Sequence, residues 1–313
     1  MKKTIRRAIT VMAVLLVGTA AAGFAACGEK TYTVTWDVNG EIVTEQYREG
    51  EMPYFKGETD RDGTATITYD FKGWNAAVTA VTADVTYVAR YTATEQVTDK
   101  AISLGVYTGT LVDGIPTGTG KLVIEGEGEK PGWTYEGTFT AGMSVTGIGK
   151  MTFTNGEISE GDFVNGQLHG WGFHDFNNGC MGVGNWENGN MNGTMWFTWS
   201  DGSGSYDVYI GKWVDGKRMD ENGFYTFANG CWYRGEFNDW INGKGEFHWG
   251  VGGGENYFRG MFENGSPVKD SYGYGRMDGV EGYIAVGPDG GWSWYNGTTE
   301  DGKTVVNGQV VEN

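Results

Sequence analysis

The chain has 313 residues, of which 55 are glycine, 5 are proline, 13 are tryptophan, 17 are tyrosine and 15 are phenylalanine. Glycine makes up about 18% of the chain against a usual ~7%, which excludes a mostly helical protein, because each interior glycine costs a helix ~1 kcal/mol relative to alanine. The scarcity of proline excludes collagen, and the many aromatic side chains argue against disorder. The formal net charge of −17 argues against nucleic acid and anionic lipid headgroups as partners.

Residues 1–26 begin with four basic side chains and continue as an uncharged run rich in alanine, valine and leucine. The run leads into Ala25-Ala26-Cys27, which resembles the bacterial lipoprotein signal, whose lipobox places small residues before an invariant cysteine. The resemblance implies cleavage before Cys27, a diacylglycerol on its thiol and acylation of the new amine. We therefore expect a lipid-anchored protein on the extracytoplasmic face of the cell membrane, with 27–30 as the lipidated N-terminus. The alternatives are an uncleaved anchor or an ordinary secretory signal.

Residues 31–95 show short stretches of alternating apolar side chains, which predict a small β domain. Phe71-Lys72-Gly73-Trp74 and the segment Val81–Tyr91 resemble the Listeria–Bacteroides repeat, or internalin-type B-repeat, which is marked by F-x-G-W and V-T-x-D-x-T-Y-x-A-x-Y. The resemblance implies a β-grasp-like fold that serves as a surface spacer or adhesive module. We expect 96–104 to be a linker.

Within this domain, Glu58, Asp60 and Asp62 alternate ahead of Gly63, as acidic residues do at the start of a calcium loop. The closing position holds Tyr69 rather than a bidentate glutamate. We therefore interpret the segment as a solvated acidic turn, with a calcium site as the weak alternative, and expect no metal elsewhere.

An aromatic-x-Gly start recurs through residues 105–275, followed by a second glycine and often by a Gly-x-Gly pair. The seven starts, two of them degenerate, are Tyr107, Tyr135, Ser159, Gly182, Tyr209, Tyr233 and Phe258. These repeats resemble the MORN repeat, whose pattern is Y-x-G-x-W-x-x-G-x-x-x-G-x-G. The resemblance implies one β-hairpin per repeat, stacked into one elongated antiparallel sheet.

Departures from the pattern carry a further expectation. Ser159 and Gly182 lack the leading aromatic ring, and Met195 replaces the last glycine of its repeat. We therefore expect the third and fourth repeats to pack less well on that face.

Side-chain alternation supports an all-β fold independently of the resemblance, because the first, third and fifth residues of each repeat share a face. On that face, large rings can lie over the bare backbone of glycines in a neighbouring strand, which gives a single-layer sheet its core. Cys180 and Cys231 occupy equivalent positions two repeats apart, about 19 Å of sheet, so we predict no disulfide between them.

The connections and the chain end complete the predicted architecture. The three insertions, 125–134, 200–208 and 250–256, fall between hairpins and so lie along one rim, where repeat proteins often carry binding loops. Residues 276–313 lose the repeat pattern, and we expect them to cap the open sheet edge.

Two groups of aromatic side chains are candidate contact sites. The first lies on the face opposite the core and consists of Trp171, Phe173, Trp196 and Phe224; the alternative is that this patch docks against another part of the chain. The second is a candidate ligand groove on the core face, for which a purely structural role is the favoured interpretation; its members are Trp186, Trp199, Trp213, Trp232 and Trp249.

Catalysis has little support in the residues. None of the three histidines lies beside a carboxylate or cysteine at motif spacing, and the sequence contains no H-E-x-x-H, G-x-S-x-G or C-x-x-C. We therefore expect a non-enzymatic cell-surface lipoprotein without cofactor, acting as a protein-binding or self-associating scaffold. The alternative is a surface protein that binds cell-wall glycans through its aromatic rings.

Overall fold

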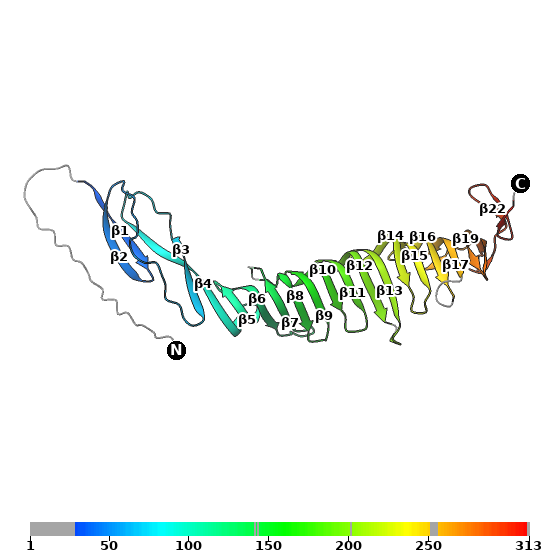
Figure 1. The fold of residues 1–313 in the computed structure, drawn as a ribbon, viewed down its shortest axis with the longest axis horizontal. Helices are drawn as coiled ribbons and strands as arrows, with labels where there is room; N and C mark the ends of the chain where they lie inside the picture. Colours follow the sequence, from blue (N-terminus) through cyan, green and yellow to red (C-terminus); the bar gives the residue numbers. More distant parts are fainter. Residues whose placement is uncertain (1–28, 141, 143, 201, 251–255, 312–313) are drawn as a thin grey trace, which may run out of the picture. The chain divides into compact units, whose positions relative to one another are not determined.

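All regular elements among the described residues are strands, as predicted. The computed structural model describes residues 29–140, 142, 144–200, 202–250 and 256–311, shown in Figure 1. The expected signal segment 1–26 and Cys27 lie outside them. The described chain forms two compact units: one contains residues up to Arg61 together with Phe71–Tyr91, and the other contains Asp62–Asp70 and everything from Thr92 onward.

The first compact unit is built on the strands β1 (Thr31–Val38), β2 (Glu41–Arg48), β3 (Ile67–Trp74) and the beginning of β4 (Val85–Ile102). β1 pairs antiparallel with β2 and parallel with β4, which makes this a mixed sheet. Its core is aromatic: Trp36 is fully buried and stacks on Tyr87 with ring centroids 4.8 Å apart.

Residues 96–104, expected to be a linker, are mostly strand. β4 continues without a break to Ile102, and its second half pairs antiparallel with the first strand of the repeats. Val97 and Ile102 pack against the core of the repeats, which explains why this stretch is held in extended form.

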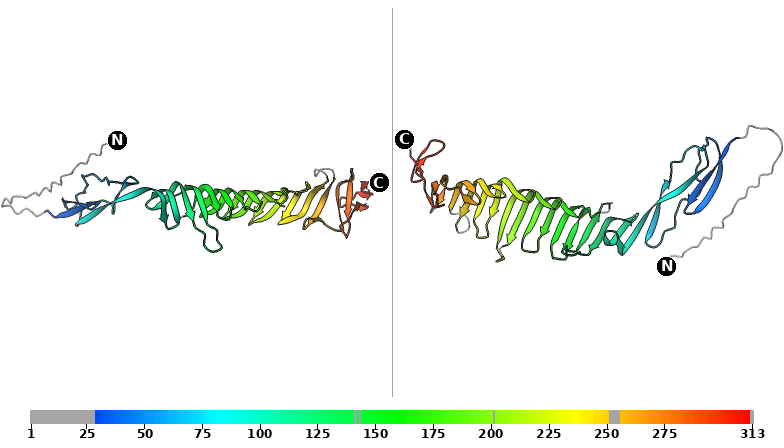
Figure 2. Two further views of the ribbon diagram at one scale, coloured as in Figure 1. Left: turned by 90° about the horizontal axis from the view of Figure 1, so that it is seen from below. Right: turned by 180° about the vertical axis from the view of Figure 1, so that it is seen from behind.

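The second compact unit contains the seven predicted hairpins. Each strand from β5 to β17 pairs antiparallel with the next one along the chain, and β17 pairs with both β18 and β19. Figure 2 shows these strands in chain order. The strands are β5 (Gly105–Val112), β6 (Ile115–Ile124), β7 (Trp133–Phe139), β8 (Gly147–Phe153), β9 (Ile158–Val164), β10 (Gln167–Asp175), β11 (Met181–Glu187), β12 (Asn190–Ser200), β13 (Tyr206–Val214), β14 (Lys217–Thr226), β15 (Trp232–Asn238), β16 (Trp240–Trp249), β17 (Asn256–Glu263), β18 (Ser266–Pro267) and β19 (Ser271–Met277).

A row of paired glycines crosses this sheet and makes room for the aromatic rings. In the first hairpins the register joins Gly109, Gly120, Gly137, Gly149, Gly161, Gly172 and Gly184 strand by strand. The next position in the row is Met195, and glycine returns at Gly211. The ring that opens each complete repeat lies over two of these glycines, which confirms the expected use of glycine as clearance.

The core is continuous from repeat to repeat because the rings of neighbouring hairpins touch. Phe139 contacts Tyr135 of its own strand at 5.1 Å and Tyr107 of the preceding hairpin at 5.3 Å, both edge to face. The same relation joins Phe237 to Tyr233 and Tyr209. A chain of T-shaped contacts therefore holds successive hairpins together, and such pairs contribute about 0.5–1.5 kcal/mol beyond area burial.

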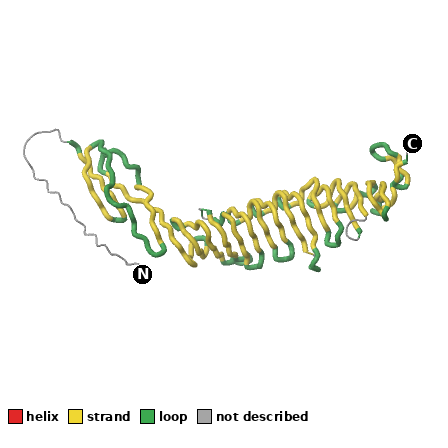
Figure 3. The backbone as a smooth tube through the Cα atoms, viewed as in Figure 1, coloured by secondary structure: helices red, strands yellow, loops and turns green. Residues whose placement is uncertain are grey.

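The connections between hairpins lie along the rim opposite the hairpin turns. Insertions lengthen three of them, between β6 and β7, β12 and β13, and β16 and β17, although 251–255 are outside the described residues (loops in Figure 3). Cys180 and Cys231 lie on the same rim in equivalent positions, each donating its backbone N–H to an asparagine side chain two residues earlier at 3.0 Å. Both thiols are free and half-buried, as predicted.

The C-terminal segment extends the sheet and then covers it. β20 (Val280–Val286) pairs with β19 along its whole length, and β21 (Trp292–Trp294) pairs with β20. A separate small sheet follows, made of β22 (Gly297–Thr298), β23 (Thr304–Val306) and β24 (Gln309–Val310). Beside β20, the Tyr283 N–H donates to the carbonyl of Gly308 at 2.7 Å, and its carbonyl accepts from Tyr295 at 2.9 Å. The chain end thereby forms hydrogen bonds with backbone groups of β20 that would be unpaired on an open edge strand.

Candidate functional site

One row of side chains crosses most of the outer face, which we define as the face of the repeat sheet opposite the aromatic core. The strand register places one residue of each strand next to one residue of the following strand, from β6 to β17. We call this the outer row; it consists of Lys121, Glu136, Lys150, Glu160, Phe173, Val183, Trp196, Ile210, Phe224, Arg234, Glu246 and Arg259.

The middle of the outer row is an apolar strip on five adjacent strands, β10 to β14. It contains Phe173, Val183, Trp196, Ile210 and Phe224. Trp196 is 39% exposed and Ile210 is 44% exposed, so the strip is open to solvent. Trp171, two residues from Phe173 and therefore on the same face, is 60% exposed.

The structure thus brings all four predicted patch residues onto one face. Sequence reasoning missed Val183 and Ile210, which fill the strip between them. Their residue types carried no special signal. Their places on either side of Trp196 follow from the pairing of β11 and β13 with β12. A contiguous apolar patch on an acidic protein is typical of a contact surface.

Charged side chains flank the strip on both sides and pair along the row. On one side, Lys121 lies 3.0 Å from Glu136; on the other, Arg259 and His248 both contact the carboxylate of Glu246. Burial opposes ionisation of Glu246, but the hydrogen bonds from Arg259 and His248 hold the pKa of its carboxyl below its ordinary value. The flanks therefore carry fixed charges of alternating sign.

Four of the five candidate groove residues lie on the core face, where a purely structural role was the favoured interpretation. Trp186, Trp199, Trp213 and Trp249 belong to the core face, and Trp186 and Trp213 are buried to 6% and 4% exposure. Trp232 is on the outer face instead, because it neighbours Tyr233, whose ring points into the core. There Trp232 stacks on His248 with centroids 3.7 Å apart and lies 5.7 Å from Phe224. Trp232 therefore adjoins the apolar strip.

A cationic side chain lies among the remaining groove aromatics. The guanidinium of Arg218 lies over the rings of Trp199 and Trp240, 5.3 Å and 4.6 Å from their centroids. Burial lowers the pKa of Arg218 from its ordinary value. Cation–π contacts with both of these rings stabilise the half-buried charge of Arg218 at this point of the core.

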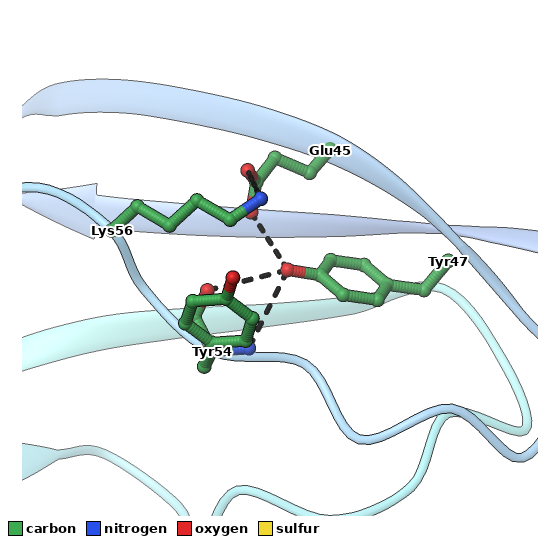
Figure 4. A network of polar contacts seen from close by, with 4 residues as sticks. All are labelled: Glu45, Tyr47, Tyr54 and Lys56. Carbon is green, nitrogen blue, oxygen red and sulfur yellow. Dashed lines mark hydrogen bonds and ion pairs between the residues drawn. The ribbon is translucent and has the colours of Figure 1, made fainter.

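The first compact unit contains a polar network between β2 and the segment that follows it. As Figure 4 shows, the hydroxyl of Tyr47 donates to Glu45 at 2.9 Å and accepts from the backbone N–H of Tyr54 at 3.4 Å, while Lys56 pairs with Glu45 at 3.3 Å. Burial, reinforced by the Glu45 hydrogen bond, raises the pKa of Tyr47. The network ties the segment after β2 back to that strand.

The acidic, histidine and cysteine side chains in the described part of the chain do not gather into metal-binding clusters. No group of three or more His, Cys, Asp or Glu side chains there is arranged to hold a metal ion, and Glu58, Asp60 and Asp62 form no such group. Within the same residues, no helix has the length and apolarity to cross a bilayer.

Comparison with known proteins adds no family to this geometry: no protein-family model matches the chain, and no curated protein matches it.

Proposed function

We propose that this chain is a non-enzymatic, lipid-anchored scaffold of the cell surface that associates with a second copy of itself through the outer row. In this proposal a B-repeat-like domain follows the lipidated Cys27 and precedes a MORN-like array. The seven stacked hairpins support the second part of that description. The observation that carries the association is the order of residues along the outer row.

The part of the outer row from Glu136 to Arg259 is self-complementary about its middle residue, Trp196. A two-fold axis parallel to the strands and centred on Trp196 lays one sheet face to face on another, so that each residue meets the one equally far on the other side. Phe173 of one copy then meets Phe224 of the other, and Val183 meets Ile210. On each sheet the strip from Phe173 to Phe224 is ~19 Å wide. The apolar strip therefore covers itself, as a two-fold interface requires.

The charges match under the same operation. Glu160 meets Arg234 of the second copy, Lys150 meets Glu246, and Glu136 meets Arg259, each pair combining opposite signs. Turning the second copy about an axis along the row instead places every charge against its own type. Like charges in contact are strongly disfavoured at interfaces, so the charges favour the arrangement centred on Trp196.

A charge-swap experiment tests this geometry. The chain carrying Cys27→Ala is purified and its association measured by sedimentation velocity. Glu160→Arg and Arg234→Glu should each weaken the dimer by about tenfold or more, which corresponds to ~1.4 kcal/mol, and the double variant should restore it. Asp301→Lys, in the turn between β22 and β23, is the matched control and should leave association unchanged.

Two outcomes would overturn the self-association. One is a wild-type chain that remains monomeric at high micromolar concentration. The other is a double variant as weak as either single variant, since only a two-fold pairing of these two positions predicts rescue. Rising salt should weaken the dimer only in part, because screening acts on the exposed flanking charges and leaves the apolar strip intact.

The lipid anchor has its own test. Metabolic labelling with a fatty-acid probe should mark the wild-type chain, and Cys27→Ala should remove the label. Labelling that survives the substitution would refute the anchor while leaving the association experiment untouched.

A second candidate function is binding of cell-wall glycans, and one observation favours it. Trp171 borders a hollow of about 620 Å³ on the outer face, which is also lined by Ile148, Lys150, Glu160 and Phe173. An exposed indole beside charged side chains suits a sugar ring, which combines an apolar face with hydroxyl groups. Saturable binding to purified wall glycan that Trp171→Ala abolishes, in a chain that stays monomeric, would favour this function over the scaffold.

A further inference from the structure

A cavity of about 220 Å³ opens on the core face of the third repeat, between β8 and β11. Its walls are mainly apolar and include Met151, Phe163, Leu168 and Trp186. Gln167 and Gly189 also line it and are exposed, so the cavity reaches the surface beside them. The expectation that this region packs less well is therefore confirmed for the third repeat.

The cavity exists because the third repeat begins with Ser159 where other repeats begin with an aromatic ring. In the register, Ser159 takes the same place between Met151 and His174 that Tyr135 takes between Leu122 and Met151. In the second repeat, the ring of Tyr135 covers Gly149, and its hydroxyl donates to the carbonyl of Thr138 at 2.9 Å. The third repeat keeps its glycines but lacks the ring.

The fourth repeat lacks the ring as well, and there the gap is filled. It begins with Gly182, and Met195 replaces the glycine of the returning strand. Met195 is 1% exposed, and its sulfur would lie 2.7 Å from a Cβ built on Gly184. The third repeat has Gly172 at the position that corresponds to Met195. The row of paired glycines therefore supplies no side chain there to replace the missing ring. A Cβ built on Gly172 would lie 2.8 Å from Cδ2 of Leu168 and 3.3 Å from Cδ1 of Trp186, so these two side chains cover Gly172. The cavity is the space left between them and Ser159.

Two polar groups lie at the cavity. The hydroxyl of Ser159, buried to 4% exposure, is hydrogen-bonded to Nδ1 of His174 at 2.7 Å. Burial lowers the pKa of His174, with weaker opposing effects from Glu157 and Asp175, so the imidazole is neutral at pH 7. A neutral imidazole both donates and accepts hydrogen bonds.

We propose that this cavity binds a small single-ring phenol, which occupies the place of the missing tyrosine ring and hydrogen-bonds to the Ser159–His174 pair. The volume suits one ring: an apolar cavity of ~150 Å³ binds benzene, whereas drug-sized ligands occupy ~300 Å³ or more. Tyr135 at the equivalent position of the preceding repeat, and Tyr107, Tyr209 and Tyr233 in more distant ones, show which group this space accommodates. The site is independent of the outer row.

Ligand-observed ¹⁹F NMR with 4-fluorophenol tests the site in the full chain carrying Cys27→Ala. The wild-type protein should broaden the fluorine signal saturably, and p-cresol should reverse the broadening. Ser159→Tyr fills the cavity and should weaken binding by about tenfold or more. Thr152→Tyr adds the same ring on the outer face of the neighbouring strand β8 and should leave binding unchanged. Fluorobenzene, which lacks the hydroxyl, should bind more weakly than 4-fluorophenol.

A second measurement locates the ligand without any substitution. In methyl-labelled protein, the signals of Met151 and Leu168 should shift on titration with p-cresol. Shifts confined to methyl groups elsewhere, absence of saturable broadening at millimolar phenol, or full binding by a folded Ser159→Tyr variant would each overturn the proposal. Ser159→Tyr should also leave self-association intact, so failure of one proposal is distinguishable from failure of the other.

Discussion

The ring of Tyr135 lies against the backbone of Gly149 on the returning strand of its hairpin, so that a Cβ built on Gly149 would be 2.7 Å from the ring atoms Cε2 and Cζ. The same Cβ would be 2.7 Å from the carbonyl oxygen of Glu136 on the paired strand. Both neighbours are held in place, the first by ring contacts to Phe139 and Phe163 and the second by the sheet. Glycine at this point is therefore a packing requirement.

Gly149→Ala should destabilise the protein by about 1–3 kcal/mol, the usual cost of overpacking a core. The backbone of Gly149 has no positive φ, so the cost comes from the clash and not from strain. Urea unfolding measures the effect. Gly142→Ala is the matched control, because the nearest atom lies 3.8 Å from a Cβ there, and it should change stability by less than ~0.5 kcal/mol. Equal effects of both substitutions would contradict the clearance role.

Met195→Gly restores the repeat pattern yet should destabilise the protein by about 2–5 kcal/mol, because it opens a cavity in the fourth repeat. Adding Gly182→Tyr supplies the ring that the pattern places there and should recover a large part of the loss. Thermal unfolding of the two variants checks both statements. A Met195→Gly protein at least as stable as wild type would show that Met195 does not compensate for Gly182.

Stability should fall as pH rises above 10, because core tyrosines resist ionisation. Burial raises the pKa of Tyr135 to about 12, and it also raises those of Tyr209, Tyr225 and Tyr233. In the unfolded chain tyrosines lose their protons near pH 10, so between pH 10 and 12 the folded state binds more protons than the unfolded state. The stabilisation is complete below pH 10 and is lost across this window.

Urea unfolding at pH 9, 10 and 11 measures the loss, to which each buried tyrosine contributes at most ~1.4 kcal/mol per pH unit. Tyr135→Phe should reduce the slope of stability against pH, whereas Tyr206→Phe, at a position 45% exposed, should not. A slope that is the same in both variants would show that Tyr135 does not contribute to the alkaline transition.

Reducing agents should leave the melting temperature unchanged, because Cys180 and Cys231 are free thiols about 19 Å apart across four strands. Alkylation of the unfolded, unreduced chain should modify both residues, as mass spectrometry of their peptides would reveal. A disulfide-linked peptide pair under these conditions would contradict the strand order between β11 and β15.

Much of the fold follows from local pattern. Side chains alternate with period two along every strand, and the aromatic-x-Gly start recurs in step with the hairpins, so the seven hairpins and their core face were predictable without any long-range information. The outer-face positions of Trp171, Phe173, Trp196 and Phe224 follow from the same alternation. The alternation also places Trp232 on the face opposite that of Tyr233, and the assignment of Trp232 to the core face was wrong because that parity was not applied.

Other features depend on which segments pair. The extension of β4 beyond 95 reflects the packing of Val97 and Ile102 on a core assembled from later hairpins, and no local signal distinguishes such a strand from a linker. The cavity at Ser159 depends on the side chains of the adjacent strands. Gly182 lacks the same ring, but Met195 fills the gap there.

The alternation of side chains and the repeat of glycine are properties of the chain itself, and they determine an all-β sheet of stacked hairpins with a ring-over-glycine core. The order of charges in the outer row is different. The chain separates Lys150 and Glu160 widely from Arg234 and Glu246. The four side chains fall on one line only when every strand between them adopts its register. Because a one-residue slip would send each of them to the opposite face, the self-complementary row is a property of the folded sheet.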